Sequence, residues 1–191
     1  MKTFELKGTL RNEYGKKAAK TLRQQDLIPC NLYGNGENVT FTVTTGDVRK
    51  LIYTPDTLIV DLTVGEKNCK AIVKELQFHP VTEQILHIDF LEVTEEKPVV
   101  VNIPIQLTGH AEGVKAGGKL SLEMRKLKVR GIYTNFPDRM TIDVTELGLG
   151  KKLSVGQLHF DNLELANAKN QVVVQVKATR ASAQAAPAGK K

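Results

Sequence analysis

The chain has 191 residues, of which 41% are hydrophobic and 25% charged, with a formal net charge of +6 and a sequence pI near 9.3. This length suits two small domains, and the hydrophobic content excludes a chain that is disordered throughout. No apolar stretch approaches the ~18 residues of a membrane-spanning helix, and the first residues alternate polar and apolar side chains instead of forming the core of a signal peptide.

The charges are spread unevenly along the chain. Residues 1–25 carry seven Lys or Arg and two acids. Residues 26–98 carry six Lys or Arg and twelve acids, and residues 99–191 carry fourteen Lys or Arg and seven acids. The positive charge of the first half is therefore gathered at its start, which suits an anionic partner.

Cysteine usage indicates a reducing compartment. Cys30 and Cys69 lie in strand-like patterns and outside any C-x-x-C pair, and two cysteines are too few for a disulfide framework. We expect reduced thiols in a cytoplasmic protein.

Residues 2–10 alternate polar and apolar side chains, which predicts an opening strand. A turn at Tyr14 and Gly15 leads into a predicted helix over residues 16–25. Residues 28–33 form the next predicted strand, and Pro29 near its start favours an edge position or a strand beginning.

Further strands and one more helix complete the first half. A capping signal at residues 45–47 predicts a short helix. The remaining strands are predicted at residues 39–43, 58–64, 70–76 and 85–93. Few helices among many short antiparallel strands indicate a small closed or partly closed β-barrel over residues 1–93.

Residues 94–98 are acidic and end in proline, which favours a linker. Residues 99–178 then read as a second, nearly all-β domain, so the fold class is mainly β with short helices in the first barrel. Its glycine-rich residues 113–119 lack the G-x-x-x-x-G-K-[ST] form of a phosphate loop and favour a turn or hairpin loop. The Ala-rich residues 179–191 favour a disordered tail. Strands of this domain are predicted at residues 99–107, 120–132, 140–144 and 171–176.

The predicted first helix carries a one-sided cluster of cations. Lys16, Lys20 and Arg23 are spaced i, i+4 and i+7 and share one helix face, and Lys17 adds to the same charge. Like charges repel across such a face, whereas a polyanion is attracted because each cation displaces condensed counterions. The alternative is an ordinary solvated helix face.

Two later strands form a second candidate feature. Glu75 and Gln77 share one strand face, and His87 and Asp89 share another, so neighbouring strands predict a polar patch. Such mixed donors and acceptors can read base edges of RNA. A solvated sheet face remains an alternative, as does a metal-dependent hydrolase built on His79, His87 and Asp89, although no metal-ligand spacing supports it.

At these stretches the chain resembles the CTC family of bacterial ribosomal proteins, also known as general stress proteins, in its long two-domain form. The first half carries Arg11-x-x-x-Gly15-Lys16-x-x-x-Lys20-x-Leu22-Arg23, Ile28-Pro29-x-x-x-Tyr33-Gly34, Gln77-x-His79-Pro80 and Leu86-His87-Ile88-Asp89-Phe90. The second half carries Val101-Asn-Ile103-Pro104-Ile105-x-Leu-x-Gly109 and Gly113-Val-x-x-Gly117-Gly118.

The resemblance implies a β-barrel that docks on an internal loop of 5S ribosomal RNA. By position, Arg11, Lys16, Lys20 and Arg23 would meet phosphates, Tyr33, Gln77, His87 and Asp89 would meet bases or sugars, and His79 would support the patch. Two departures stand out: Ala19-Lys20-Thr21 replaces a frequent Ser-Arg-Arg, and Glu75 replaces a frequent aspartate. Lysine lacks the bidentate geometry of arginine, which weakens the assignment at Lys20 and Thr21.

The sequence thus predicts a non-enzymatic component of the large ribosomal subunit, cytoplasmic and ribosome-associated. Its expected partners are 5S rRNA and other components of that subunit, with the protein a monomer within the ribosome and with no membrane, cofactor or metal. Two alternatives stay open: a general RNA-binding stress protein acting off the ribosome, and the hydrolase named above.

Overall fold

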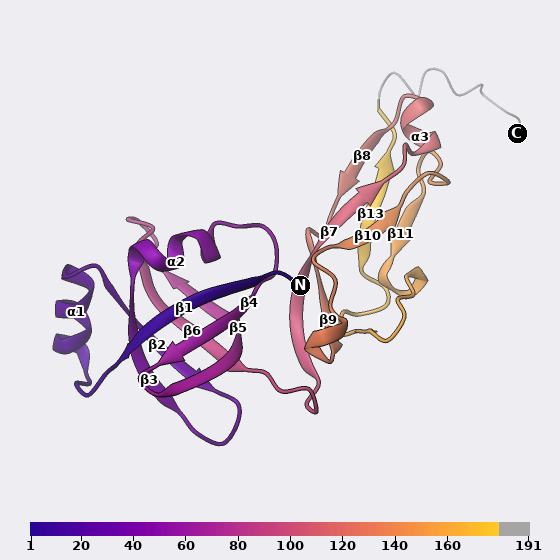
Figure 1. Cartoon of the computed structure of the whole chain (residues 1–191). Coiled ribbons are helices and arrows are strands. Elements are labelled where there is room, and N and C mark those ends of the chain that lie inside the picture. The colour runs from indigo at the N-terminus through magenta and orange to yellow at the C-terminus, as the bar shows by residue number, and fades with distance from the viewer. Residues whose placement is uncertain (180–191) are drawn as a thin grey trace, which may run out of the picture. The chain divides into compact units, whose positions relative to one another are not determined.

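The computed structural model describes residues 1–179 and divides into two compact units (Figure 1). The first unit comprises Met1–Val99 with Ile132–Asp138, and the second comprises Val100–Gly131 with the described residues from Arg139 to Thr179. Residues 180–191, which contain nearly all of the predicted disordered tail, lie outside the described residues. No helix within residues 1–179 is long and apolar enough to cross a membrane.

The first unit is a closed six-stranded barrel in the order β1-β3-β2-β6-β5-β4, which confirms the predicted barrel. Its strands are β1 (Thr3–Leu10), β2 (Leu27–Tyr33), β3 (Val39–Thr44), β4 (Ile59–Val64), β5 (Lys67–Phe78) and β6 (Ile85–Glu92).

Of the two positions predicted for Pro29, the edge of a sheet is wrong, because a closed barrel has no edges. β2 lies between β3 and β6, and Pro29 is buried. Pairing with β6 begins one residue later, at Cys30, so Pro29 stands at the start of the β2–β6 ladder, where its missing N–H is tolerated.

Alternating apolar side chains of every strand fill the barrel. Phe41 and Phe90 are fully buried with ring centroids 5.6 Å apart in a tilted pair. Gly8 gives this pair its room, because a Cβ at position 8 would lie 2.4 Å from Cδ2 of Phe41. The interior is therefore a packed core and not a channel.

Two helices connect barrel strands and differ in how they are held. α2 (Thr45–Ile52) buries Val48 and Leu51, and its N-cap is Thr44, whose hydroxyl oxygen accepts a hydrogen bond from the Asp47 amide at 3.2 Å. α1 (Lys16–Gln24) begins after Gly15, at φ +100°, and has no fully buried residue. α1 thus lies on the barrel surface with most of its side chains in solvent.

A short segment from the second half of the sequence packs with the first unit. It contains the 3-10 turn η1 (Tyr133–Asn135), whose buried Tyr133 donates its hydroxyl to Oε1 of Glu95 at 3.2 Å. Oδ1 of Asp138 accepts a hydrogen bond from the Lys2 amide at 3.2 Å. The linker predicted at residues 94–98 does not include the packing of Ile132–Asp138 with the first unit. The exact domain limits stay a prediction.

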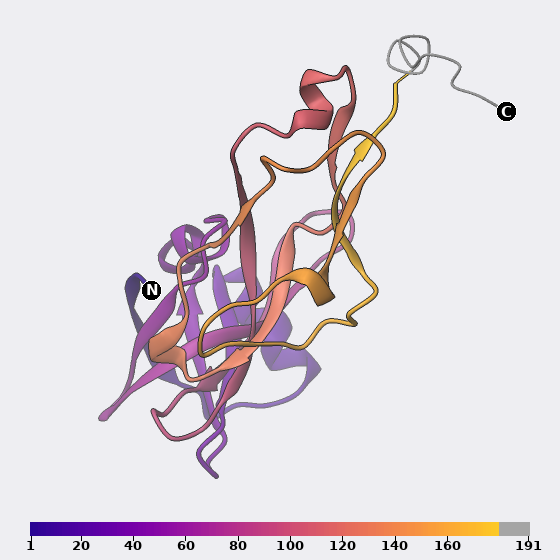
Figure 2. The same ribbon diagram turned by 90° about the vertical axis from the view of Figure 1, so that its right-hand side faces the viewer.

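The second unit consists of two sheets and is nearly all β, as predicted (Figures 1 and 2). One sheet has the order β10-β7-β9-β12 and the other the order β11-β13-β8. Their elements are β7 (Val99–Thr108), α3 (Glu112–Lys115), β8 (Lys119–Leu122), β9 (Lys126–Gly131), β10 (Met140–Asp143), β11 (Lys152–Ser154), η2 (Val155–Gln157), β12 (Glu164–Leu165) and β13 (Val172–Lys177).

Two predictions for this unit need correction. The strand predicted at residues 120–132 is broken into β8 and β9, which belong to different sheets, because the amides of Glu123 and Met124 both turn to the Val173 carbonyl. The glycine-rich stretch forms the helical turn α3, which Figure 2 shows between β7 and β8, instead of a simple hairpin loop. Gly113 permits it by lying against the Gly148 backbone, where a Cβ would come within 2.6 Å.

Candidate nucleic-acid interface

Helix α1 presents uncompensated positive charge. Lys16, Lys17 and Lys20 are exposed, and none of the ion pairs within residues 1–179 includes them. The helix contains no acid, and no side chain caps its N-terminus. Lysines in the first turn of a helix are destabilised by the helix dipole. An external anion would therefore stabilise this helix face more than contacts within the protein do.

Arg23 plays a different part from the lysines. It is half-buried, and its Nε and Nη2 donate to the Leu86 carbonyl at 3.1 and 2.9 Å. These bonds anchor the end of α1 on β6, one residue before His87. The cationic helix and the polar strands therefore meet on the same wall of the barrel.

Arg11 is also held by its surroundings. Its Nε donates to the Glu13 carbonyl at 2.6 Å, and its guanidinium lies 5.7 Å from the ring centroid of Tyr14. The Tyr14 hydroxyl is 3.2 Å from that of Thr40 on β3. Arg11 thus stiffens the loop that leads into α1.

The polar patch spans three strands. The register places Asn31 of β2 beside Asp89 of β6, and Asp89 beside Glu75 of β5, while Gln77 lies beside His87. Nδ1 of His87 and Oδ1 of Asp89 are 3.2 Å apart, and both side chains are about one-fifth exposed, at 21% and 22%. The predicted adjacency of Glu75, Gln77, His87 and Asp89 is confirmed.

A β-bulge in β5 makes this patch possible. Ala71 and Val73 point to the barrel core before the bulge, whereas Leu76 points to the core after it. The extra residue between Val73 and Glu75 reverses the alternation, so that Glu75 and Gln77 face outward. Without the bulge, both polar side chains would lie inside the barrel.

Tyr33 lies on the same outer face at the end of β2. Its partial burial, together with the carboxylates of Asp89 and Glu75, raises the pKa of the phenol above its ordinary value. The hydroxyl therefore stays protonated and can donate a hydrogen bond. Sequence reasoning missed Asn31, although strand alternation places it two residues before Tyr33 on this face.

His79 shapes the β5–β6 turn. Its Nδ1 accepts hydrogen bonds from the amides of Val81 and Thr82 at 3.3 and 3.2 Å. Because Nδ1 accepts these two hydrogen bonds, it is not available to bind another group. No cluster of three or more His, Cys, Asp or Glu suited to a metal ion occurs in the described part of the chain, and the hydrolase hypothesis gains no site.

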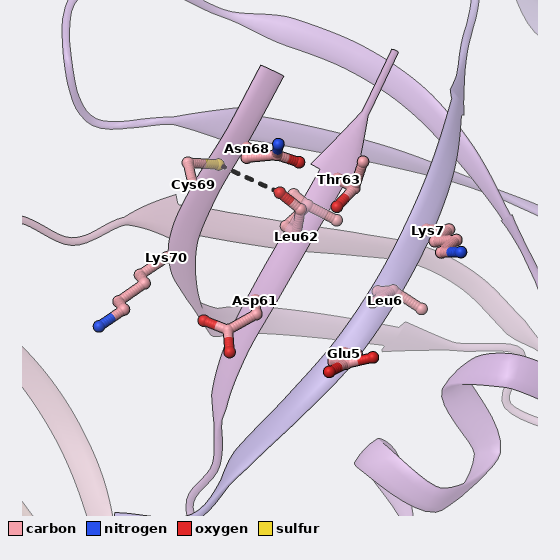
Figure 3. A pocket seen from close by; sticks show the side chains of 9 residues that line it. All are labelled: Glu5, Leu6, Lys7, Asp61, Leu62, Thr63, Asn68, Cys69 and Lys70. Atoms are coloured by element: carbon pink, nitrogen blue, oxygen red, sulfur yellow. Dashed lines mark hydrogen bonds between the residues drawn. The ribbon is translucent and has the colours of Figure 1, made fainter. Parts of the chain in front are cut away.

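A hollow lies on another wall of the barrel (Figure 3). It has a volume of about 510 Å³ and is lined by β1, β4 and β5. Glu5, Asp61 and Lys70 lie side by side across these strands, and Lys7, which also lines the hollow, brings the lining to two acids and two lysines. Burial, together with Glu92, raises the pKa of the Cys69 thiol, whose Sγ donates to the Leu62 carbonyl at 3.9 Å. A protonated, bonded thiol is a poor nucleophile.

Comparison with known proteins covers both halves of the chain. Residues 6–90 match the family described as the Ribosomal L25p family, and residues 98–180 match the domain described as Ribosomal protein TL5, C-terminal domain. A protein of Porphyromonas gingivalis is 61% identical over 188 residues, which cover 97% of this chain and 98% of that protein.

Other relatives are similar over the same extent. A protein of Parabacteroides distasonis is 56% identical over 188 residues, covering 95% of this chain and 96% of that protein. A protein of Phocaeicola vulgatus is 52% identical over 198 residues, covering 100% of both. All three relatives are named large ribosomal subunit protein bL25.

Proposed function

The chain belongs to the ribosomal L25p family, and on that basis we propose that it is a structural component of the large ribosomal subunit that binds 5S rRNA through its first unit. Members of this family are structural ribosomal proteins and not enzymes, which leaves the hydrolase hypothesis without support. The protein acts in the cytoplasm, associated with the ribosome.

One observation carries the proposal. The hydrogen bonds of Arg23 to the Leu86 carbonyl bring α1 next to the strand that holds His87 and Asp89. Charge attraction and base recognition therefore occur on one continuous surface, as a single folded RNA requires.

The two parts of this surface have different tasks. Lys16, Lys17 and Lys20 attract phosphates without regard to sequence, because their charges have no ion-pair partner within residues 1–179. Arg11 and Arg23 contribute charge as well, although each also uses donors to hold its own loop or helix. These cations therefore determine most of the affinity and its salt dependence.

The polar patch supplies the specificity. Carboxylates are repelled by phosphates, so Asp89 and Glu75 suit base amino groups, while Gln77, His87 and Tyr33 offer donors to bases or riboses. The narrow major groove of regular RNA duplex excludes side chains, so the target is a widened or irregular stretch. His79 supports this patch indirectly, by fixing the turn that joins its two strands.

The test compares two RNAs with one variant and one control. Asp89→Asn is expected to reduce the discrimination between 5S rRNA and an unrelated duplex of equal length by about 1–3 kcal/mol, the scale of a good base contact. Asp61→Asn, on the wall of the large hollow, removes the same charge and should leave the discrimination unchanged. Equal weakening on both RNAs would count against base recognition by Asp89.

A general RNA-binding stress protein acting off the ribosome is the alternative function. Sedimentation of cell extracts separates the two, because a subunit component travels with the large subunit at moderate salt. Recovery of the protein mainly in free ribonucleoprotein fractions would favour the alternative.

A further inference from the structure

A row of cations lies on the outer face of strand β9 in the second unit. Lys126, Lys128 and Arg130 are exposed, while Leu127 and Val129 between them are fully buried at 0% exposure. Alternating strand positions place the three cations on one face at intervals of about 7 Å.

Most of this charge is uncompensated. Within residues 1–179, no ion pair includes Lys126 or Lys128. Arg130 approaches Glu164 only to 4.0 Å, and the two side chains are 55% and 74% exposed. Like charges repeated along a strand repel each other, and only Arg130 has an acidic neighbour across the sheet in the described chain.

The strand beneath the row is firmly held. The Lys128 amide donates to Oδ1 of Asn167 at 2.7 Å, and the Lys128 carbonyl accepts from the Ala166 amide at 2.8 Å. On the other side, the Ile105 amide of β7 donates to the Arg125 carbonyl at 2.9 Å. The cations are thus presented on a rigid platform, which lowers the entropy lost on binding.

The rest of this sheet face mixes neutral polar side chains with the exposed apolar Val100 of β7. Burial of Val101 and Ile103 turns Asn102 of β7 outward, and Gln106 of the same strand lies beside Thr141 of β10. The acid Asp143 stands at the far strand, where its carboxylate accepts hydrogen bonds from the hydroxyl and the amide of Thr145. Amides and hydroxyls beside a cation row can bond phosphate and sugar oxygens.

We propose that this outer face of the β10-β7-β9-β12 sheet, centred on Lys126, Lys128 and Arg130, binds the phosphate backbone of an RNA segment other than the one bound by the first unit. A regular row of cations matches a polyanion that repeats regularly, whereas carboxylates on an acidic protein surface have no fixed repeat. The inference does not depend on which RNA the first unit binds.

The opposite sheet of this unit provides the matched control. Lys119, Lys151 and Lys152 are exposed cations outside the β9 face, and none of them belongs to an ion pair in the described chain. Their replacement removes as much charge as replacement of the β9 row. A difference between the two triple variants therefore reports position and not net charge.

The experiment uses the full chain and a 30-base-pair RNA duplex of arbitrary sequence, with binding measured from 50 to 200 mM KCl. Lys126→Gln/Lys128→Gln/Arg130→Gln is expected to weaken binding at least tenfold at 50 mM and to lower the slope of log affinity against log salt by about two to three. The control Lys119→Gln/Lys151→Gln/Lys152→Gln should change binding less than twofold. Lys126→Arg/Lys128→Arg should retain the affinity, because both substitutions keep the positive charge.

Three outcomes would overturn the proposal. The two triple variants could weaken binding equally, or the unaltered chain could fail to bind the duplex measurably. Alternatively, the β9 cations could bind polyglutamate more tightly than RNA, which would indicate an acidic protein as the partner. A parallel titration with 5S rRNA separates this proposal from the function of the first unit, since the β9 variant should still discriminate 5S rRNA from the duplex.

Discussion

At the scale of single residues, Arg23 shows how one side chain can join two parts of a surface. Its spacing from Lys16 and Lys20 indicates a phosphate contact, and its hydrogen bonds to Leu86 show that it also fastens α1 to β6. We predict that Arg23→Ala weakens RNA binding on all sequences, flattens its salt dependence and loosens α1. Hydrogen exchange of the α1 amides measures the last effect, and unchanged protection would contradict it.

Glu123 offers a residue-scale prediction with a defined pH range. Hydrogen bonds and charge from Lys177, with further bonds from Gln175 and Ser121, lower the pKa of this carboxyl from 4.5 to about 2. A pKa lowered by folding contributes stability that is present above pH 4.5 and is lost as the pH falls toward 2.

Glu123→Gln should therefore lower the stability of the second unit slightly at pH 6, because the group is exposed to solvent. The difference from the unaltered chain should shrink as the pH falls from 4.5 to 2. Urea unfolding at pH 6, 4 and 3 checks this prediction, and a difference that grows on acidification would refute it.

At the scale of elements, α1 functions as a charged element held by few contacts. Lys16→Gln/Lys20→Gln should lower the salt slope of RNA binding by about two, because each phosphate contact contributes about 0.9 for duplex. The melting temperature should stay constant, since neither lysine has a partner in the described chain. Arg49→Gln/Lys50→Gln on α2 is the matched control, and an equal loss there would mean that only net charge matters.

At the scale of the whole molecule, the first unit depends on residues beyond position 100. Phe136 and Tyr133 are buried at 2% and 6% exposure, and both belong to the segment Ile132–Asp138 that packs with the barrel unit. We predict that a fragment of residues 1–98 unfolds at a lower temperature than the same unit in the full chain.

A point substitution tests the same dependence without truncation. Phe136→Ala in the full chain should destabilise the first unit by about 3 kcal/mol, the scale for removing a buried phenylalanine side chain. Thr134→Ala, at an exposed position of the same segment, is the control. Calorimetry that shows unchanged unfolding of the first unit after Phe136→Ala would rule out a stabilising role for the segment.

Local pattern was enough to predict the strands of the barrel and which candidate residues share a face. Period-two alternation identified the strands that carry Glu75, Gln77, His87 and Asp89, and helical spacing grouped the cations of α1. Both features depend only on residues a few positions apart, so they can be read directly from the chain.

Tertiary structure decided what depends on distant partners. Four features join segments that are far apart in sequence. The closed barrel places the strand of Pro29 between two neighbours, and the register places Asn31 beside Asp89. Arg23 is anchored on Leu86, and Tyr133 packs with the first unit. Even the bulge before Glu75 follows from pairing with β6. Such contacts form only when burial and hydrogen bonding across the whole unit favour them, and no short stretch of sequence contains that balance.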